Sequence, residues 1–242
     1  MTDMICAIDQ GTTGSTAVLL DRRLRVQGRA TREFEQIFPK PSWVEHDPET
    51  LWQSTLESLQ AALDEAGCDP TQVACVGITN QRETTIVWDR ETGEPIHNAI
   101  VWQDRRTRGK VKQLSDEGHE RRVQQRTGLL LDPYFSATKV SWILDQVDGA
   151  RQRAAQGELA FGTVDSWILW NMTHGRKHCT DISNASRTLL MNLDTGDWDP
   201  EMLDLFDVPP DVLPEIRENA DVLGETRGVP GIPRTSRDRT SP

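Results

Sequence analysis

Residues 5–21 form the segment that most constrains what this chain can fold into. Their sequence is ICAIDQGTTGSTAVLLD, in which an apolar run ends at an acid, a short loop of Gly, Thr and Ser follows, and a second apolar run begins. Two apolar runs separated by a glycine-containing loop predict strand, turn and strand. Neither the Lys of a Walker A loop nor the helix pattern of a dinucleotide-binding motif follows this loop.

The loop between these two predicted strands has the chemistry of an anion site. Its small residues leave backbone N–H groups accessible and add hydroxyls, and such groups can form a concave cradle for phosphate. Asp9 stands at the start of the loop, where a carboxylate could hold Mg²⁺, a cation that prefers oxygen ligands. Phosphoryl transfer requires this combination of a phosphate cradle and charge neutralisation. A plain β-hairpin with a polar turn is the alternative interpretation.

Composition narrows the classes of partner that we expect. The 242 residues carry a formal net charge of -11, and this acidity disfavours binding to nucleic acid, because its phosphates would be repelled. No apolar run is long enough to span a membrane, and the N-terminus lacks the basic region and apolar core of a signal peptide. We therefore expect a cytoplasmic protein that binds no nucleic acid.

Strand-like and helix-like segments are interleaved along the chain. Asp47 and Pro48 are a typical helix start, and Gly67 is a typical helix end. Further strands are expected within residues 24–38, 73–79, 84–88 and 96–102, and further helices within 105–114, 140–147 and 163–172. This order predicts an α/β fold with a mixed sheet.

Three further segments place polar or aromatic residues directly beside strand-like runs. Arg82 and Glu83 are adjacent and opposite in charge, so they could present donors and acceptors to a small polyol. Trp102 ends an apolar run and could form an apolar wall for a carbon backbone. Tyr134, the only tyrosine, stands in a break before a predicted helix, where its hydroxyl could reach a ligand. A surface ion pair, a core tryptophan and an ordinary helix-entry turn are the respective alternatives.

Together these motifs resemble the FGGY family of carbohydrate kinases. The resemblance runs from about residue 5 to about residue 226. It rests on an ordered series of segments, which are DQGTT (9–13), REFEQIFPKP (32–41), WVEHDP (43–48), ITNQRETTIVW (78–88), NAIVWQ (98–103), DPYFS (132–136) and NASRT (184–188). The segments around residues 43–48 and 81–85 are long and specific matches.

The resemblance implies an actin-like ATPase architecture, in which two ribonuclease-H-like domains close on a cleft. Residues 1–226 would be the first, glycerol-binding domain. The implied activity is the ATP-dependent phosphorylation of glycerol to sn-glycerol 3-phosphate with Mg²⁺, in a homo-oligomer. Two alternatives stay open, namely a kinase for another polyol or sugar, and a non-catalytic fragment that binds glycerol or a partner.

The resemblance also assigns roles to individual residues. The glycerol pocket would be lined by Arg82, Glu83, Trp102 and Tyr134. The phosphate loop of the nucleotide site would consist of Gly11, Thr12, Thr13, Gly14 and Ser15. Asp9 would position Mg²⁺, through water.

The chain departs from the family pattern in two places. The family usually has an Arg where Thr16 follows the loop. The match ends near residue 226, before the segment that carries the family's general-base aspartate, so no catalytic residue is assigned within this chain. Residues 227–242 are rich in Arg and Pro and are expected to form a disordered tail. On this basis we expect the chain alone to be catalytically inactive.

Overall fold

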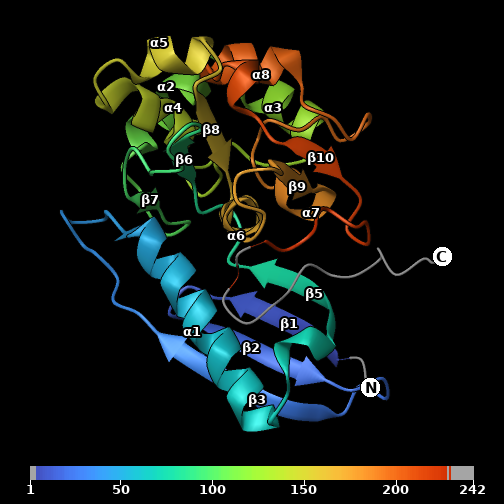
Figure 1. Cartoon of the computed structure of the whole chain (residues 1–242). Coiled ribbons are helices and arrows are strands. Elements are labelled where there is room, and N and C mark those ends of the chain that lie inside the picture. The colour runs from blue at the N-terminus through green and yellow to red at the C-terminus, as the bar shows by residue number, and fades with distance from the viewer. Residues whose placement is uncertain (1–3, 228, 230–242) are drawn as a thin grey trace.

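The computed structural model describes residues 4–227 and residue 229. Figure 1 shows two parts, a twisted sheet crossed by one long helix and, above it, a group of shorter helices and strands. Apart from residues 227 and 229, the tail that the sequence predicts lies outside the described residues. Within the described part of the chain, no helix combines the length and apolarity needed to cross a bilayer.

The sheet contains four strands in the order β3-β2-β1-β5. These strands are β1 (Met4–Gln10), β2 (Gly14–Leu20), β3 (Val26–Glu33) and β5 (Val73–Asn80). β1 pairs antiparallel with β2 and parallel with β5, so the sheet is mixed. The predicted hairpin and the predicted mixed sheet are both confirmed.

Helix α1 (Pro48–Ala66) packs across one face of this sheet (Figure 1). The Asp47 side chain accepts a hydrogen bond from a backbone N–H in the first turn of the helix. Gly67, with a φ of 57°, ends the helix. A Cβ on Gly28 would lie 2.2 Å from the carbonyl oxygen of Ala62, so β3 can approach the helix only through a glycine. Apolar side chains of both layers form the first core, which includes Cys6, Ile8, Ala17, Leu19, Leu51, Leu59, Ala62 and Leu63.

The second part is built from short strand pairs and helices around its own core. The strand pairs are β4 (Glu45–His46) with β7 (Ala99–Ile100), β6 (Ile86–Asp89) with β8 (Leu159–Gly162), and β9 (Cys179–Asp181) with β10 (Glu215–Arg217). The helices are α2 (Arg108–Asp116), α3 (Glu120–Thr127), α4 (Ala137–Gln146), α5 (Ala150–Ala155), α6 (Val164–Met172), α7 (Ile182–Ala185) and α8 (Pro200–Phe206), with 3-10 turns at Pro70–Gln72 and Pro210–Val212.

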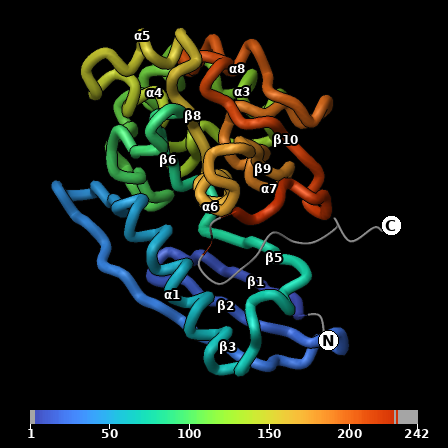
Figure 2. Tube along the Cα trace, in the orientation of Figure 1, coloured from blue at the N-terminus to red at the C-terminus, as the bar shows by residue number. Residues whose placement is uncertain are grey.

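The two parts meet at α6 and at the edge strand β5. Figure 2 shows β5 at the side of the sheet that is nearest to α6. Trp88 of β6 packs against two tryptophans of α6, with ring centroids 5.3 Å from Trp167 and 5.7 Å from Trp170. The chain passes from the sheet to the second part through the elbow at residues 81–85, directly after β5.

Two of the predicted strands were too long. Residues 24–38, where further strands were expected, contain a single strand at Val26–Glu33, and the strand expected within 96–102 covers only Ala99–Ile100. In both cases the flanking apolar residues lack a continuous partner strand. Ile37, for example, forms an isolated bridge with Glu45. Burial rather than strand pairing accounts for the apolar character of Val101, which is fully buried.

Candidate active site

The loop after β1 is a tight turn held by its own backbone. The N–H of Gly11 donates to the carbonyl of Gly14 at 2.9 Å. A Cβ on Gly14 would lie 2.8 Å from the carbonyl oxygen of Arg32, so this position accommodates only glycine without a shift of β3. Thr13 at the tip of the loop is exposed. The loop is therefore small, compact and accessible, as an anion site requires.

Ser15 does not present its hydroxyl to this loop. It is fully buried, and its Oγ lies 2.8 Å from Ser54 Oγ and 3.4 Å from Thr55 Oγ1, both on α1. Ser15 therefore shapes the loop by anchoring the start of β2 to the helix. The hydroxyls left near the loop are those of Thr12 and Thr13.

The loop is joined to the aromatic residues that the sequence singles out. The indole Nε1 of Trp102 donates to Thr12 Oγ1 at 3.0 Å. The Trp102 ring lies 5.5 Å from the Tyr134 ring, measured between centroids, at an interplanar angle of 60°. Trp102 and Tyr134 are both half-buried. Segments far apart in the sequence thus form one aromatic wall beside this loop.

Glu83 adds a buried carboxylate next to this wall. Its side chain is 3% exposed, and its Oε1 lies 2.7 Å from Nε of Arg187. Its backbone adopts a φ of 64°, which is uncommon for a residue other than glycine. Its carbonyl accepts hydrogen bonds from Ser136 Oγ and Thr85 Oγ1, each at 3.1 Å. Backbone strain of this kind is characteristic of positions where function fixes the geometry.

Two predicted site residues, Arg82 and Asp9, take no part in the contacts that join the loop, the aromatic wall and Glu83. Arg82 is exposed, and no hydrogen bond or ion pair joins it to another described residue. Asp9 is also exposed and stands opposite Thr16 on β2 and Thr79 on β5. Both side chains are free to meet a ligand.

Asp9 fits a metal that arrives with phosphate groups. Among residues 4–227 and 229, no cluster of three or more His, Cys, Asp or Glu side chains could hold a metal ion. Mg²⁺ commonly takes one or two carboxylates and completes its shell with water and phosphate oxygens. A single exposed carboxylate beside an anion loop satisfies that requirement, whereas a resident protein-bound metal would need more ligands.

A buried hydrogen-bond network underlies the loop and the aromatic wall, and the sequence did not predict it. Gln81 Nε2 donates to Gln10 Oε1 at 3.0 Å and to the carbonyl of Gly11 at 3.1 Å. Thr84 Oγ1 donates to Gln81 Oε1 at 2.9 Å, and the backbone N–H of Trp102 donates to Thr84 Oγ1 at 3.3 Å. Buried hydrogen bonds of this kind hold the loop and the elbow in one arrangement.

Lys139 on α4 is a second buried feature that sequence reasoning missed. Its side chain is fully buried, and its Nζ donates to the carbonyls of Tyr134 and Phe135. Burial lowers the pKa of Lys139 to about 7, against the opposing effect of nearby carboxylates on Asp104, Glu83 and Asp132. The lysine thereby ties down the turn that carries Tyr134. Its position three residues after Ser136 gave no local signal of this role.

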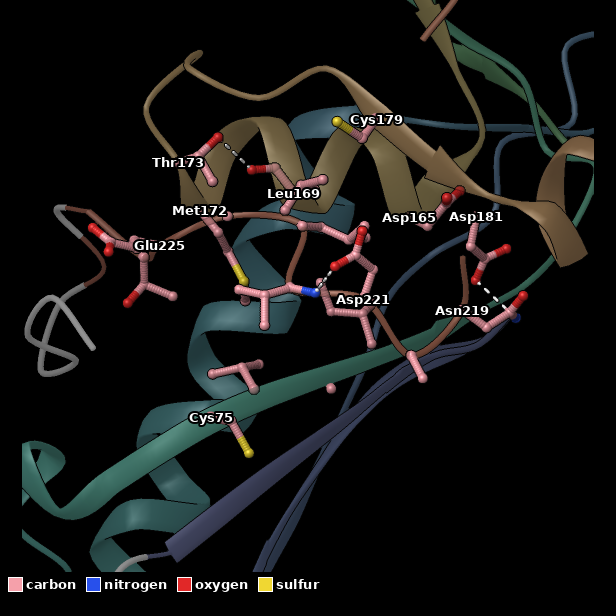
Figure 3. A pocket seen from close by; sticks show the side chains of 18 of the residues that line it. Cys75, Asp165, Leu169, Met172, Thr173, Cys179, Asp181, Asn219, Asp221 and Glu225 are labelled. Carbon is pink, nitrogen blue, oxygen red and sulfur yellow. Dashed lines mark hydrogen bonds between the residues drawn. The ribbon is translucent and has the colours of Figure 1, made fainter. Parts of the chain in front are cut away.

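A cavity of about 430 Å³ lies elsewhere, between β5, α6, β9 and residues 219–226 (Figure 3). Its lining includes Asp165 and Asp181 but none of the predicted site residues. Burial raises the pKa of Asp165 to about 6, although Thr163 and Thr180 both donate to its carboxylate. The candidate active site is therefore the junction of loop, elbow and aromatic wall, and this cavity is separate from it.

Comparison with known proteins identifies the family. The model of the N-terminal domain of the FGGY family of carbohydrate kinases matches residues 4–229. Glycerol kinase of Methylobacterium nodulans is 58% identical over 226 residues, which are 93% of this chain and 45% of that protein. Glycerol kinase of Stenotrophomonas maltophilia is 56% identical over 223 residues, which are 92% of this chain and 45% of that protein. The chain thus spans about half the length of the curated relatives it matches.

Solved structures agree with this assignment and confirm the predicted actin-like ATPase fold. Plasmodium falciparum glycerol kinase, solved with ADP, superposes with a TM-score of 0.88 at 36% identity, covering 96% of this chain and 47% of that one. Gluconate kinase of Lactobacillus acidophilus has a TM-score of 0.87 at 21% identity, covering 97% and 46% respectively, and supports the fold alone. The chain belongs to the FGGY family of carbohydrate kinases and matches its N-terminal domain.

Proposed function

We propose that this domain binds glycerol and presents one of its terminal hydroxyls for ATP-dependent phosphorylation. The observation that carries the proposal is the hydrogen bond between Trp102 and Thr12. It joins an aromatic wall, which lies beside the buried carboxylate of Glu83, to a loop with the features of a phosphate cradle. An acceptor pocket beside a phosphate loop is what transfer of a phosphoryl group to an alcohol requires.

The proposed pocket matches the chemistry of a small polyol. Glycerol is neutral and carries three hydroxyls on a short carbon chain, so it needs paired donors and acceptors together with an apolar surface. Glu83 supplies acceptors and Arg82 supplies donors, while the rings of Trp102 and Tyr134 contact the carbon atoms. A site built in this way would reject analogues that lack a hydroxyl, since its buried polar groups would then stay unpaired.

The phosphate side of the proposed site uses fewer side chains. Gly11, Thr12, Thr13 and Gly14 would contact the nucleotide phosphates, and Ser15 would hold the loop in shape from within the core. Asp9 would hold Mg²⁺ through water. When bound, Mg²⁺ supplies positive charge that offsets the charge developing on the phosphates.

The named relatives support the same activity, since the curated ones quoted above are glycerol kinases and one solved glycerol kinase contains ADP. A cytoplasmic location and assembly into a homo-oligomer accompany this proposal as predictions.

Two measurements test the proposed function. The first is calorimetric titration of the 242-residue chain with glycerol, with Glu83→Gln as the variant expected to lose binding. The second uses a chimaera in which residues 1–226 are joined to the C-terminal half of the Methylobacterium nodulans relative, assayed for ADP release with glycerol, xylulose and gluconate. We expect turnover with glycerol. Preferential turnover of a sugar substrate would contradict the choice of substrate, and absence of glycerol binding would contradict the proposal itself.

A further inference from the structure

The segment from Asn184, within α7, to Thr188 makes three contacts around the proposed glycerol site. Asn184 exchanges side-chain hydrogen bonds with Asn80 at the end of β5, at 3.0 and 3.3 Å. The carbonyl of Thr188 accepts from the N–H of Ala137, at 2.8 Å, at the start of α4. Between these two anchors, Arg187 reaches Glu83. The segment is therefore held in place on both sides of the arginine.

Arg187 binds Glu83 in a manner that leaves part of both groups available. Its Nε donates to Oε1 at 2.7 Å, and this is the one hydrogen bond between the two side chains. Glu83 Oε2 accepts no hydrogen bond from the described residues. It is nevertheless not fully buried. The Arg187 side chain is 32% exposed, compared with 3% for Glu83. One carboxylate oxygen is thus fixed, and the other retains contact with solvent.

The guanidinium of Arg187 also lies against the aromatic residues of the Tyr134 turn. Its Cζ is 4.9 Å from the centroid of Phe135 and 5.8 Å from that of Tyr134. A cation within about 6 Å of an aromatic face is attracted to it. Arg187 therefore contacts both Glu83 and the Tyr134 turn, which come from segments that local sequence does not connect.

We propose that Arg187 is a positioning residue that sets the polyol specificity of this site by holding the Glu83 carboxylate in one orientation. With Oε1 occupied by Arg187, Oε2 is directed to a hydroxyl of the ligand. Without the arginine, the carboxylate would be a buried charge without its partner and would rotate or take up water. This inference rests on the proposed glycerol site.

The experiment compares binding of three ligands to the 242-residue chain. Glycerol, 1,2-propanediol and 1,3-propanediol are titrated calorimetrically into the wild type, Arg187→Gln and Arg187→Lys. We expect Arg187→Gln to bind glycerol about tenfold more weakly, because it loses a charge-assisted hydrogen bond. For this variant, the ratio of the affinity for glycerol to the affinity for the weaker-binding diol should fall towards one. Arg187→Lys keeps the charge and should recover part of that preference.

Arg153 offers a matched control. Its side chain is 33% exposed and pairs with Asp89 and with Glu158, and none of these residues belongs to the proposed site. Arg153→Gln should lower the melting temperature as much as Arg187→Gln does, and should leave the ligand preference unchanged. A double-mutant cycle with Glu83→Gln should be strongly non-additive for glycerol affinity if Arg187 acts through Glu83.

The outcomes separate the two claims. If the wild type binds no glycerol, both the proposed function and the role of Arg187 are overturned. If the wild type binds glycerol and Arg187→Gln keeps its affinity and its preference, only the role of Arg187 is overturned. If Arg187→Gln and Arg153→Gln lose the ligand preference equally, Arg187 contributes only to general stability. That result would also overturn its proposed role.

Discussion

The indole Nε1 of Trp102 donates a hydrogen bond of 3.0 Å to the hydroxyl of Thr12, across a separation of 90 residues. The backbone N–H of Trp102 donates to Thr84 Oγ1, which in turn donates to Gln81 beneath the loop. Trp102 is thus tied to the loop through its ring and through its backbone. In the proposed site, the wall that contacts the acceptor and the loop that contacts phosphate cannot move independently.

Replacing Trp102 with Phe tests this connection, because the variant keeps an apolar ring and removes the N–H donor. A net hydrogen bond contributes about 0.5–1.5 kcal/mol, so we expect kcat of the chimaera to fall by up to about tenfold. The affinity for glycerol should change less, since the apolar wall remains. The matched control is Trp198→Phe, because Trp198 Nε1 donates to the carbonyl of Pro214 at 2.8 Å, outside the proposed site. Equal effects of both variants on kcat would contradict the prediction.

Arg82 is predicted to bind the polyol directly. It is exposed and has no partner among the described residues, so its removal should not unfold the domain. Loss of a charged hydrogen-bonding partner is worth roughly 1.5–3 kcal/mol. We therefore expect Arg82→Ala to lower kcat/KM for glycerol by one to two orders of magnitude in steady-state assays of the chimaera. Arg121→Ala, an exposed arginine on α3, is the control and should be unchanged. Normal kinetics for Arg82→Ala would remove it from the pocket.

Asp9 is predicted to act through Mg²⁺ rather than through glycerol. Asp9→Asn keeps the size of the side chain and removes its charge, so glycerol affinity of the 242-residue chain should be unchanged. In the chimaera, kcat should fall by about 100-fold or more, since the metal contributes several kcal/mol of charge stabilisation. Titration of Mg²⁺ at fixed ATP provides the measurement, and Asp116→Asn on α2 provides the control. A near-normal kcat with normal Mg²⁺ dependence would contradict this role.

Local signals account for the parts of the fold that the sequence predicted correctly. The cap residues Asp47 and Gly67 both mark α1, because capping depends on a few adjacent backbone groups. The first hairpin was likewise evident from two apolar runs around a short loop. The short strands were harder to predict from the sequence. β7, for example, comprises only Ala99–Ile100 and pairs with Glu45–His46 of β4. A strand of two residues is defined by its partner, and the partner lies far away in sequence.

The same distinction applies to the candidate site. Glu83, Trp102, Tyr134 and Thr12 were predicted from their own segments, and the structure brings them together. Arg187 was not given a role, because its contact with Glu83 joins residues 104 apart and no spacing rule anticipates it. Lys139 was likewise given no role. Only the packing of the second core shows that it is fully buried, with the backbone carbonyls of Tyr134 and Phe135 as its hydrogen-bond partners.

The buried Lys139 predicts how stability depends on pH. Its pKa is lowered by burial from 10.5 to about 7 in the folded state. Between these two values the unfolded chain binds more protons than the folded one, so the free energy of unfolding should increase as pH rises from about 7. The limiting slope for one group is about 1.4 kcal/mol per pH unit. Chemical denaturation of the wild type at pH 7.0, 7.5, 8.0 and 8.5 measures this increase.

The comparison that isolates Lys139 is the difference between the wild type and Lys139→Met at each pH. Burial also raises the pKa values of Cys6, Cys68 and Cys179, and these thiols should lower stability at more alkaline pH. Both proteins carry those cysteines, so their contribution cancels in the difference. The wild type should therefore gain stability relative to Lys139→Met as pH rises through this range. A difference that is flat with pH would mean that the folded protein keeps the Lys139 ammonium charged, with the carboxylates of Glu83, Asp104 and Asp132 outweighing its burial.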